Sequence, residues 1–195
     1  MIRKSIVTLI TLCSVMSLSS TGHMTGGQRN RVPKPRVSPA AGRWNTFTSP
    51  DRDFTLDFPG TPKRVPDEQG PVTIIRSYGL TTKDGMRFAV NFQDIGGDPQ
   101  SRQNNEFARD HEELVTAAAR EQGRRVVQVH RLAKNVIEIE YRMRSEDSND
   151  DISYVERTIL RRGRVYSVSC GSVVGGREVD RSACRRFFNS MRFIK

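Results

Sequence analysis

Cys170 and Cys184 are the residues of this sequence whose types and spacing most plainly allow covalent chemistry. Cys170 shares the alternation of Tyr166 and Val168 in a strand-like run, so it is expected on the apolar side of a strand. Cys184 borders the apolar stripe of the last predicted helix. A helix that folds back on the preceding strand would bring the two within bridging distance. They are the only cysteines left once the predicted leader, which contains Cys13, is removed, and an even cysteine count in an exported protein favours a disulfide. Two buried thiols remain the alternative, and no C-x-x-C spacing supports a redox or metal role.

The histidines are His23, His111 and His130, and none has a partner at zinc-ligand spacing. His111 falls on the apolar stripe of a predicted helix, which favours a structural histidine. A Cys–His nucleophile pair would need one of the cysteines close to His111 or His130, and nothing local in the sequence supports that arrangement. We therefore predict no catalytic residue.

A polar acidic segment, residues 146–151, offers oxygen ligands at Asp147, Asn149 and Asp151. Calcium prefers such ligands, but Ile152 and Thr158 stand where an EF-hand loop has its glycine and its distal glutamate. The spacing favours a solvated loop between strands, and a weak calcium site is the alternative.

A second cluster is basic. Arg161, Arg162 and Arg164 surround a predicted hairpin tip, and Arg185 and Arg186 lie on the last helix, which makes them candidates for an anion-binding patch. No aromatic residues alternate with these arginines, so specific nucleic-acid binding is not expected. The sequence also lacks a phosphate-binding glycine loop, a G-x-S-x-G elbow and an H-E-x-x-H pair, so we expect no cofactor and no enzyme activity.

Residues 1–20 are predicted to form a signal peptide. Arg3 and Lys4 precede an apolar run, Ile6–Leu18, that is too short to span a bilayer comfortably but suits a signal-peptide core. Cys13 raises a lipoprotein alternative, which Leu12 disfavours because lipoprotein sites carry a small residue there. The prediction is export to the periplasm or the extracellular space, with no membrane span in the mature chain.

Residues 21–43 are predicted to be a disordered linker rich in Gly, Pro, Ser and Arg. Residues 23–28 resemble a vector-derived tag, and a native origin stays equally open. Residues 1–43 hold seven of the 32 basic residues and no acidic one, so the net charge of +10 falls to +3 from Trp44 onward. The basicity therefore gives little reason to expect nucleic-acid binding by the folded part.

Residues 44–195 are predicted to form one α+β domain in the order ββββ-α-ββββ-α. Alternating apolar residues predict strands over 44–48, 54–58, 72–80, 86–95, 125–132, 136–144, 152–160 and 165–173, paired as hairpins in one antiparallel sheet. Apolar stripes predict two packed helices, from Asp98 to about Gln122 and from Gly175 to about Arg192. Residues 61–71 are expected to be irregular because they contain Pro62 and Pro66.

The opening W-x-x-F-x-S-P-D-x-x-F-T-L-D-F-P-G-T-P, Trp44 to Pro62, resembles the start of a family of exported bacterial domains with a PsbP-like fold. The likeness continues in Ser77-Tyr78, in Phe88-Ala89-Val90 and in Phe187-x-x-Ser190-x-Arg192-Phe193. The resemblance implies an α-β-α sandwich related to PsbP-like, Mog-like and DcrB-like proteins, whose members act as binding or assembly factors. No partner-binding residue of those proteins maps onto this chain.

The sequence thus predicts an exported, non-catalytic binding or accessory domain of the cell envelope, with a protein or envelope component as its partner and an open oligomeric state. A small extracytoplasmic hydrolase with a pocket at a sheet edge is one alternative. A stabiliser that responds to calcium or an anion is the other.

Overall fold

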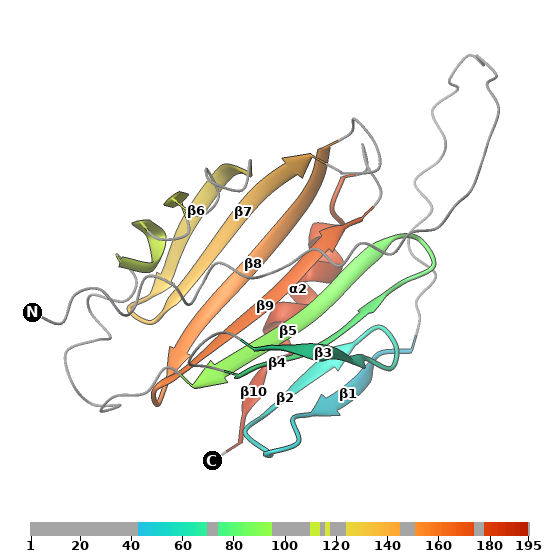
Figure 1. Ribbon diagram of the computed structural model, residues 1–195. Helices are drawn as coiled ribbons and strands as arrows, with labels where there is room; N and C mark the ends of the chain where they lie inside the picture. The colour runs from blue at the N-terminus through green and yellow to red at the C-terminus, as the bar shows by residue number, and fades with distance from the viewer. Residues whose placement is uncertain are drawn as a thin grey trace, which may run out of the picture.

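The computed structural model describes residues 43–69, 74–94, 110–113, 116–117, 124–144, 151–173 and 178–194. They form an α+β fold with two antiparallel sheets (Figure 1). The strands are β1 (Asn45–Thr48), β2 (Phe54–Phe58), β3 (Lys63–Gln69), β4 (Ile74–Thr81), β5 (Met86–Asp94), β6 (Arg125–Ala133), β7 (Val136–Arg144), β8 (Asp151–Arg161), β9 (Arg164–Ser172) and β10 (Arg192–Phe193). Helix α2 spans Arg181–Asn189, and residues 110–113 and 116–117 are also helical.

The larger sheet has seven strands in the order β3-β4-β5-β9-β8-β7-β6. Most neighbours are hairpins, with β3–β4, β4–β5, β6–β7, β7–β8 and β8–β9 all antiparallel. The exception is β5, which pairs with β9 over the full range from Met86↔Ser172 to Asp94↔Arg164. This long-range pairing joins the two halves of the chain through the middle of the sheet.

The smaller sheet has three strands in the order β1-β2-β10. Its centre is β2, in which Phe54, Leu56 and Phe58 are fully buried and the residues between them are half-buried, as the alternation predicted. The C-terminal strand β10 pairs with β2 through Phe193↔Phe54. The first and last segments of the domain are therefore held together in one sheet (Figure 1).

The main core lies on one face of the seven-stranded sheet, which we call the α2 face. Aromatic residues of β2 and α2 meet those of β5 and β9 there, with Phe58 and Phe88 each 4.9–5.2 Å from Phe187 between ring centroids. The geometry of both contacts is edge-to-face, the arrangement that aromatic rings prefer. α2 and the small sheet thus cover the same half of this face.

A second, smaller core lies on the opposite face of the sheet, over β7 and β8. It contains Ile137, Ile139, Tyr141, Ile152 and Tyr154. The helical residues 110–113 lie on this side, since Glu112 forms an ion pair with Arg131 of β6 at 2.5 Å.

Strand β8 marks the boundary between the two cores. Val155 packs into the α2-face core, whereas Ile152 and Tyr154 pack into the opposite one. Beyond β8, β7 buries Ile137 and Ile139 on the opposite face and turns Glu138 and Glu140 to the α2 face. The apolar side of the sheet therefore changes between β9 and β7, which places helices on both faces, as in the expected sandwich.

Three details of the expected order are corrected. The small sheet is separate, so the strands do not form one sheet. Residues 63–69 form β3 despite Pro66, because β3 is the edge of its sheet and an edge strand tolerates a missing N–H. α2 begins at its N-cap Asp180, whose carboxylate accepts from the Ser182 and Ala183 N–H groups. The signal peptide, the linker up to residue 42 and most of the helix expected at 98–122 lie outside the described residues.

Candidate functional site

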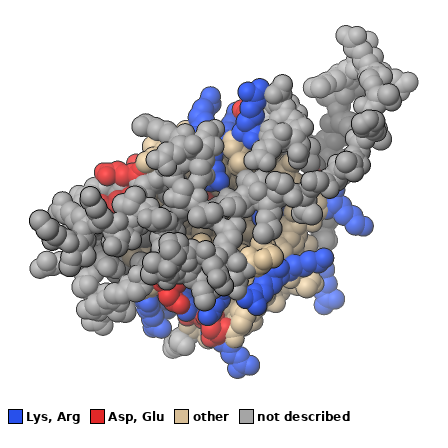
Figure 2. Space-filling view, viewed as in Figure 1, with Lys and Arg blue, Asp and Glu red and all other residues tan. Residues whose placement is uncertain are grey.

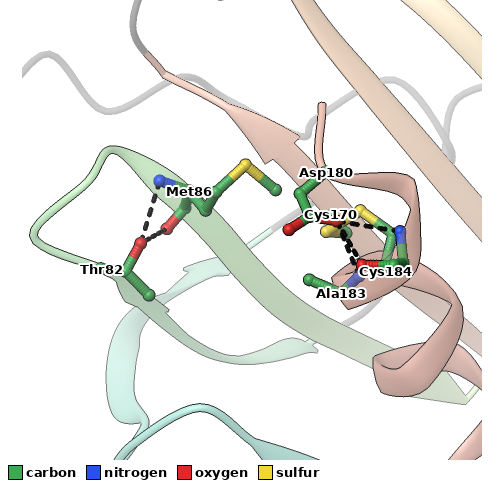
Figure 3. The surroundings of a disulfide bond; sticks show 7 residues. Thr82, Met86, Cys170, Asp180, Ala183 and Cys184 are labelled. Atoms are coloured by element: carbon green, nitrogen blue, oxygen red, sulfur yellow. Dashed lines mark hydrogen bonds between the residues drawn. A yellow bond between two sulfur atoms is a disulfide. The ribbon is translucent and has the colours of Figure 1, made fainter. Parts of the chain in front are cut away.

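The disulfide predicted between Cys170 and Cys184 is present. The two Cα atoms are 5.5 Å apart, and both residues are almost completely buried. Figure 3 shows how the bond joins β9 to the first turn of α2, with the Met86 side chain extending toward it. Because the bond lies in the main core and links β9 to α2, its role is to hold α2 on the sheet.

The predicted arginine cluster is divided by the structure. Arg164 points into a group of carboxylates: it donates from Nε and Nη2 to Asp94 at 2.7 and 3.1 Å, and from Nη1 to Asp51 and to Asp53, the latter at 3.0 Å. The hydrogen bond to Asp94, followed by the contacts with Asp51, raises the pKa of the Arg164 guanidinium despite burial. Arg164 therefore ties β9 to the end of β5 and to the loop between β1 and β2.

Aromatic rings line this arginine–carboxylate cluster. Tyr166 donates its hydroxyl hydrogen to Asp53, and Arg164 lies 5.8 Å from the centre of the Phe92 ring. Burial raises the pKa of the Tyr166 hydroxyl, and the hydrogen bond to Asp53 raises it further. A tyrosine held in its neutral form serves as a hydrogen-bond donor here rather than as a base.

The other predicted arginines lie elsewhere. Arg161 is stacked on Phe193 at 4.3 Å, Arg162 is exposed in the β8–β9 turn, Arg185 is exposed on α2, and Arg186 lies 4.4 Å over Trp44. Figure 2 likewise shows Lys and Arg side chains at several separate places around the visible face. The five arginines thus form two groups, one at the β8–β9 turn and one on α2.

His111 lies inside the molecule and is 2% exposed. Burial lowers the pKa of its imidazole, and the nearby negative charge of Glu156 acts in the opposite direction. His130 is exposed on the edge strand β6, opposite Glu138 of β7. The two histidines of the domain thus have different surroundings, one buried and one exposed, and both cysteines are in the disulfide.

Glu156 is a polar centre that the sequence analysis missed. Its carboxylate accepts hydrogen bonds from Ser167 at 2.6 Å, Tyr141 at 3.3 Å and Thr158 at 3.4 Å. All of these side chains lie on the face opposite α2, at the edge of the second core. The alternation of β8 predicts an inward glutamate at this position, but only the β7–β8–β9 register reveals its hydroxyl partners.

The three carboxylates around Arg164 were also missed. Their common partner, Arg164, is 113 positions from Asp51, 111 from Asp53 and 70 from Asp94 in the sequence. Nothing in the sequence indicates this pairing, since Arg52 is the basic residue next to Asp51 and Asp53.

The predicted calcium ligands Asp147 and Asn149 lie outside the described residues. Asp151 is exposed at the start of β8, opposite Arg144. Within the described ranges, no three His, Cys, Asp or Glu side chains are grouped as a metal site would need. Among the same residues, no helix has the length and apolar character to cross a membrane.

The class of fold is thus α+β, a seven-stranded antiparallel sheet with a three-stranded sheet and α2 on one face. No protein-family model and no curated protein matches the chain. Among solved structures it is similar to the cyanobacterial PsbP (CyanoP) of Synechocystis sp. PCC 6803, with 12% identity, a TM-score of 0.48 and coverage of 91% of this chain and 99% of that one.

A second similar structure is a protein of Bacteroides thetaiotaomicron VPI-5482, with 10% identity, a TM-score of 0.45 and coverage of 77% of this chain. The chain spans about half, 48%, of the length of that protein. Likeness at these identities concerns the fold alone.

Proposed function

We propose that this chain is an exported, non-catalytic binding or accessory domain of the cell envelope. The observation that carries the proposal is how the domain uses its reactive side chains. Both of its cysteines are consumed in the Cys170–Cys184 disulfide, and His111 is buried inside the molecule. The groups most suited to chemistry therefore hold the fold together, which leaves the surface for binding.

Export is supported by the disulfide and by the N-terminal sequence. Disulfides persist in oxidising compartments, and one that is buried in the core forms part of the stable fold. Arg3, Lys4 and the apolar run Ile6–Leu18 have the order of a signal peptide. Pulse-labelling during expression in a bacterial host tests export: the expected result is a shortened, oxidised chain in the envelope fraction.

The test of binding is retention of an envelope component by the full chain coupled through its C-terminus. The expected result is a component that is released by excess free chain and is not retained by the reduced, urea-unfolded chain. If nothing is competed away, and the chain instead turns over a member of a substrate panel in a way that His111→Gln abolishes, the proposal is wrong.

A small hydrolase is the second candidate, because Ser167, Glu156 and His111 bring a hydroxyl, a carboxylate and an imidazole to one face of the sheet. The hydrogen bonding differs from that of a hydrolase triad, since the Ser167 hydroxyl donates to Glu156 rather than to the imidazole. A fluorophosphonate probe decides between the two. Labelling that is lost in Ser167→Ala supports the hydrolase, and no labelling supports the binding domain.

A further inference from the structure

Two arginines occupy a backbone conformation that disfavours a side chain. Arg52 has φ 54° and Arg162 has φ 51°, and no other non-glycine residue of the described chain has a positive φ. Left-handed conformations of this kind favour glycine or asparagine and cost other residues free energy. Such a cost persists where the side chain serves another purpose.

The turn geometry explains why glycine or asparagine would suit both positions better. Arg162 and Gly163, with φ 71°, are the two central residues of the β8–β9 hairpin, for which Asn-Gly is the preferred pair. Arg52 completes the loop between β1 and β2, where its N–H donates to the Ser49 carbonyl at 2.9 Å. Arginine thus occupies two turn positions at which glycine or asparagine would be locally more stable.

The two turns lie at the same end of the molecule. Arg164, two residues after Arg162, binds Asp51 and Asp53 on either side of Arg52. The C-terminal segment joins them: Arg161 is stacked on Phe193, and the Ile194 N–H donates to the Asp53 carbonyl at 2.9 Å. Figure 1 shows the β8–β9 turn, the β1–β2 loop and β10 together toward its lower edge. We call Arg52, Arg161, Arg162 and Ile194 the arginine tip.

The arginine tip presents positive charge to the solvent. The carboxylates at this end, Asp51, Asp53 and Asp94, are bound to Arg164, and Asp51 is also 3.4 Å from Arg76. Arg52 and Arg162 are exposed, and neither has an ion pair with a described carboxylate. Ile194, 38% exposed, adds an apolar side chain beside them.

We propose that the arginine tip binds the phosphate groups of an anionic lipid bilayer. The guanidinium fork matches phosphate oxygens in pairs, and basic residues near an anionic membrane strengthen binding electrostatically. Turns that project from the molecule can contact a flat membrane surface, which a pocket cannot. Ile194 can contact the interface between headgroups and acyl chains. The inference rests on the proposed function and gives it a partner.

The test uses a double variant, Arg52→Gly with Arg162→Asn, in the exported full chain. Binding to phosphatidylglycerol vesicles at low salt should fall about 25-fold, since each of the two basic residues near an anionic surface contributes about fivefold. The melting temperature without vesicles should rise, because both backbone conformations are relieved. The matched control, Arg125→Gln with Arg185→Gln, removes two exposed charges elsewhere and should bind the vesicles like the wild type.

The proposal is overturned if the tip variant binds the vesicles as tightly as wild type, or if the control loses as much, because net charge or the basic linker would then explain binding. It is also overturned if the chain prefers polyglutamate to the vesicles, which would indicate an acidic protein partner. The proposed function fails on a different result: free chain releases no envelope component from the coupled chain, and the chain instead turns over a substrate in a way that His111→Gln abolishes.

Discussion

Gly171 of β9 lies directly opposite Tyr154 of β8, and the tyrosine ring fills the space that a side chain at position 171 would need. A Cβ placed on Gly171 would be 2.2 Å from Tyr154 Cδ1 and 2.7 Å from the Ser153 carbonyl oxygen. The Tyr154 ring is fixed in turn by stacking on Tyr141, with ring centroids 5.7 Å apart. The absence of a side chain on β9 thus allows the tyrosine pair of the second core to lie flat on the sheet.

Gly171→Ala should destabilise the domain by about 1–3 kcal/mol, because the added methyl group overpacks a region bounded by backbone as well as by a ring. Urea denaturation measures the loss. In a Tyr154→Ala background the same change should cost less, since the ring has gone and only the Ser153 carbonyl remains in the way. Equal urea midpoints for Gly171→Ala and wild type would show that the tyrosine pair moves freely.

The Cys170–Cys184 disulfide should contribute about 3 kcal/mol in the chain-entropy model, given its sequence separation of 14. Cys170→Ala with Cys184→Ala should therefore lower the urea midpoint clearly. Wild type under strong reductant should show a similar loss, whereas the double variant should be unaffected by reductant. An unchanged midpoint in both comparisons would mean that packing alone holds α2 on β9.

Much of the fold was predictable because it depends on local pattern. The alternation of Phe54, Leu56 and Phe58 identified β2, and the turn glycines Gly85 and Gly163, both at positive φ, separated hairpin strands at the correct places. The strands that the sequence did not predict lack a hydrophobic periodicity that could identify them. β10 is two residues long and is defined only by its pairing with β2, and β3 carries a proline that edge position alone makes acceptable.

The candidate sites were less predictable, because their chemistry depends on residues far apart in the sequence. Cys170 and Cys184 could be paired since a strand and the next helix are close in sequence. Arg164 could not be assigned to Asp51, Asp53 and Asp94 without the β5–β9 register and the position of the small sheet. The charge pattern of the sequence grouped Arg164 with Arg162. In the structure, Arg164 lies among three carboxylates, whereas Arg162 is exposed in a turn.

Arg164→Gln should destabilise the domain by about 2 kcal/mol at neutral pH, since it removes the charged hydrogen-bond donor that Asp51 and Asp53 share. Burial acts to raise the pKa of Asp51, but hydrogen bonds from Ser49 and Arg164 and the Arg164 charge outweigh it, so the pKa is lowered from 3.8. A carboxyl of this kind stabilises the fold above its unfolded-state pKa, and that stability is lost as the pH falls through the folded-state value.

The difference between Arg164→Gln and wild type should therefore be largest near pH 7 and shrink as the pH falls below 3.8. Urea midpoints measured from pH 7 to pH 3 test this dependence. Arg185→Gln, which removes an exposed charge of α2, serves as the control and should change the midpoint little at any pH. A difference that stays constant with pH would indicate lost packing on Phe92 rather than lost ion pairing.

His111→Gln should flatten the dependence of stability on pH. Burial lowers the pKa of His111 below its ordinary value of 6.5, with Glu156 acting against that shift. The unfolded chain therefore takes up the proton first, and stability present above pH 6.5 is lost as the pH falls toward the folded-state pKa. Urea midpoints at pH 7.5, 6.5 and 5.5, a series spanning about one unit on either side of the ordinary histidine pKa, should fall in wild type and change less in His111→Gln. His130→Gln, on the exposed edge strand, should keep the wild-type slope, and identical slopes in all three proteins would show that Glu156 offsets the burial of His111 completely.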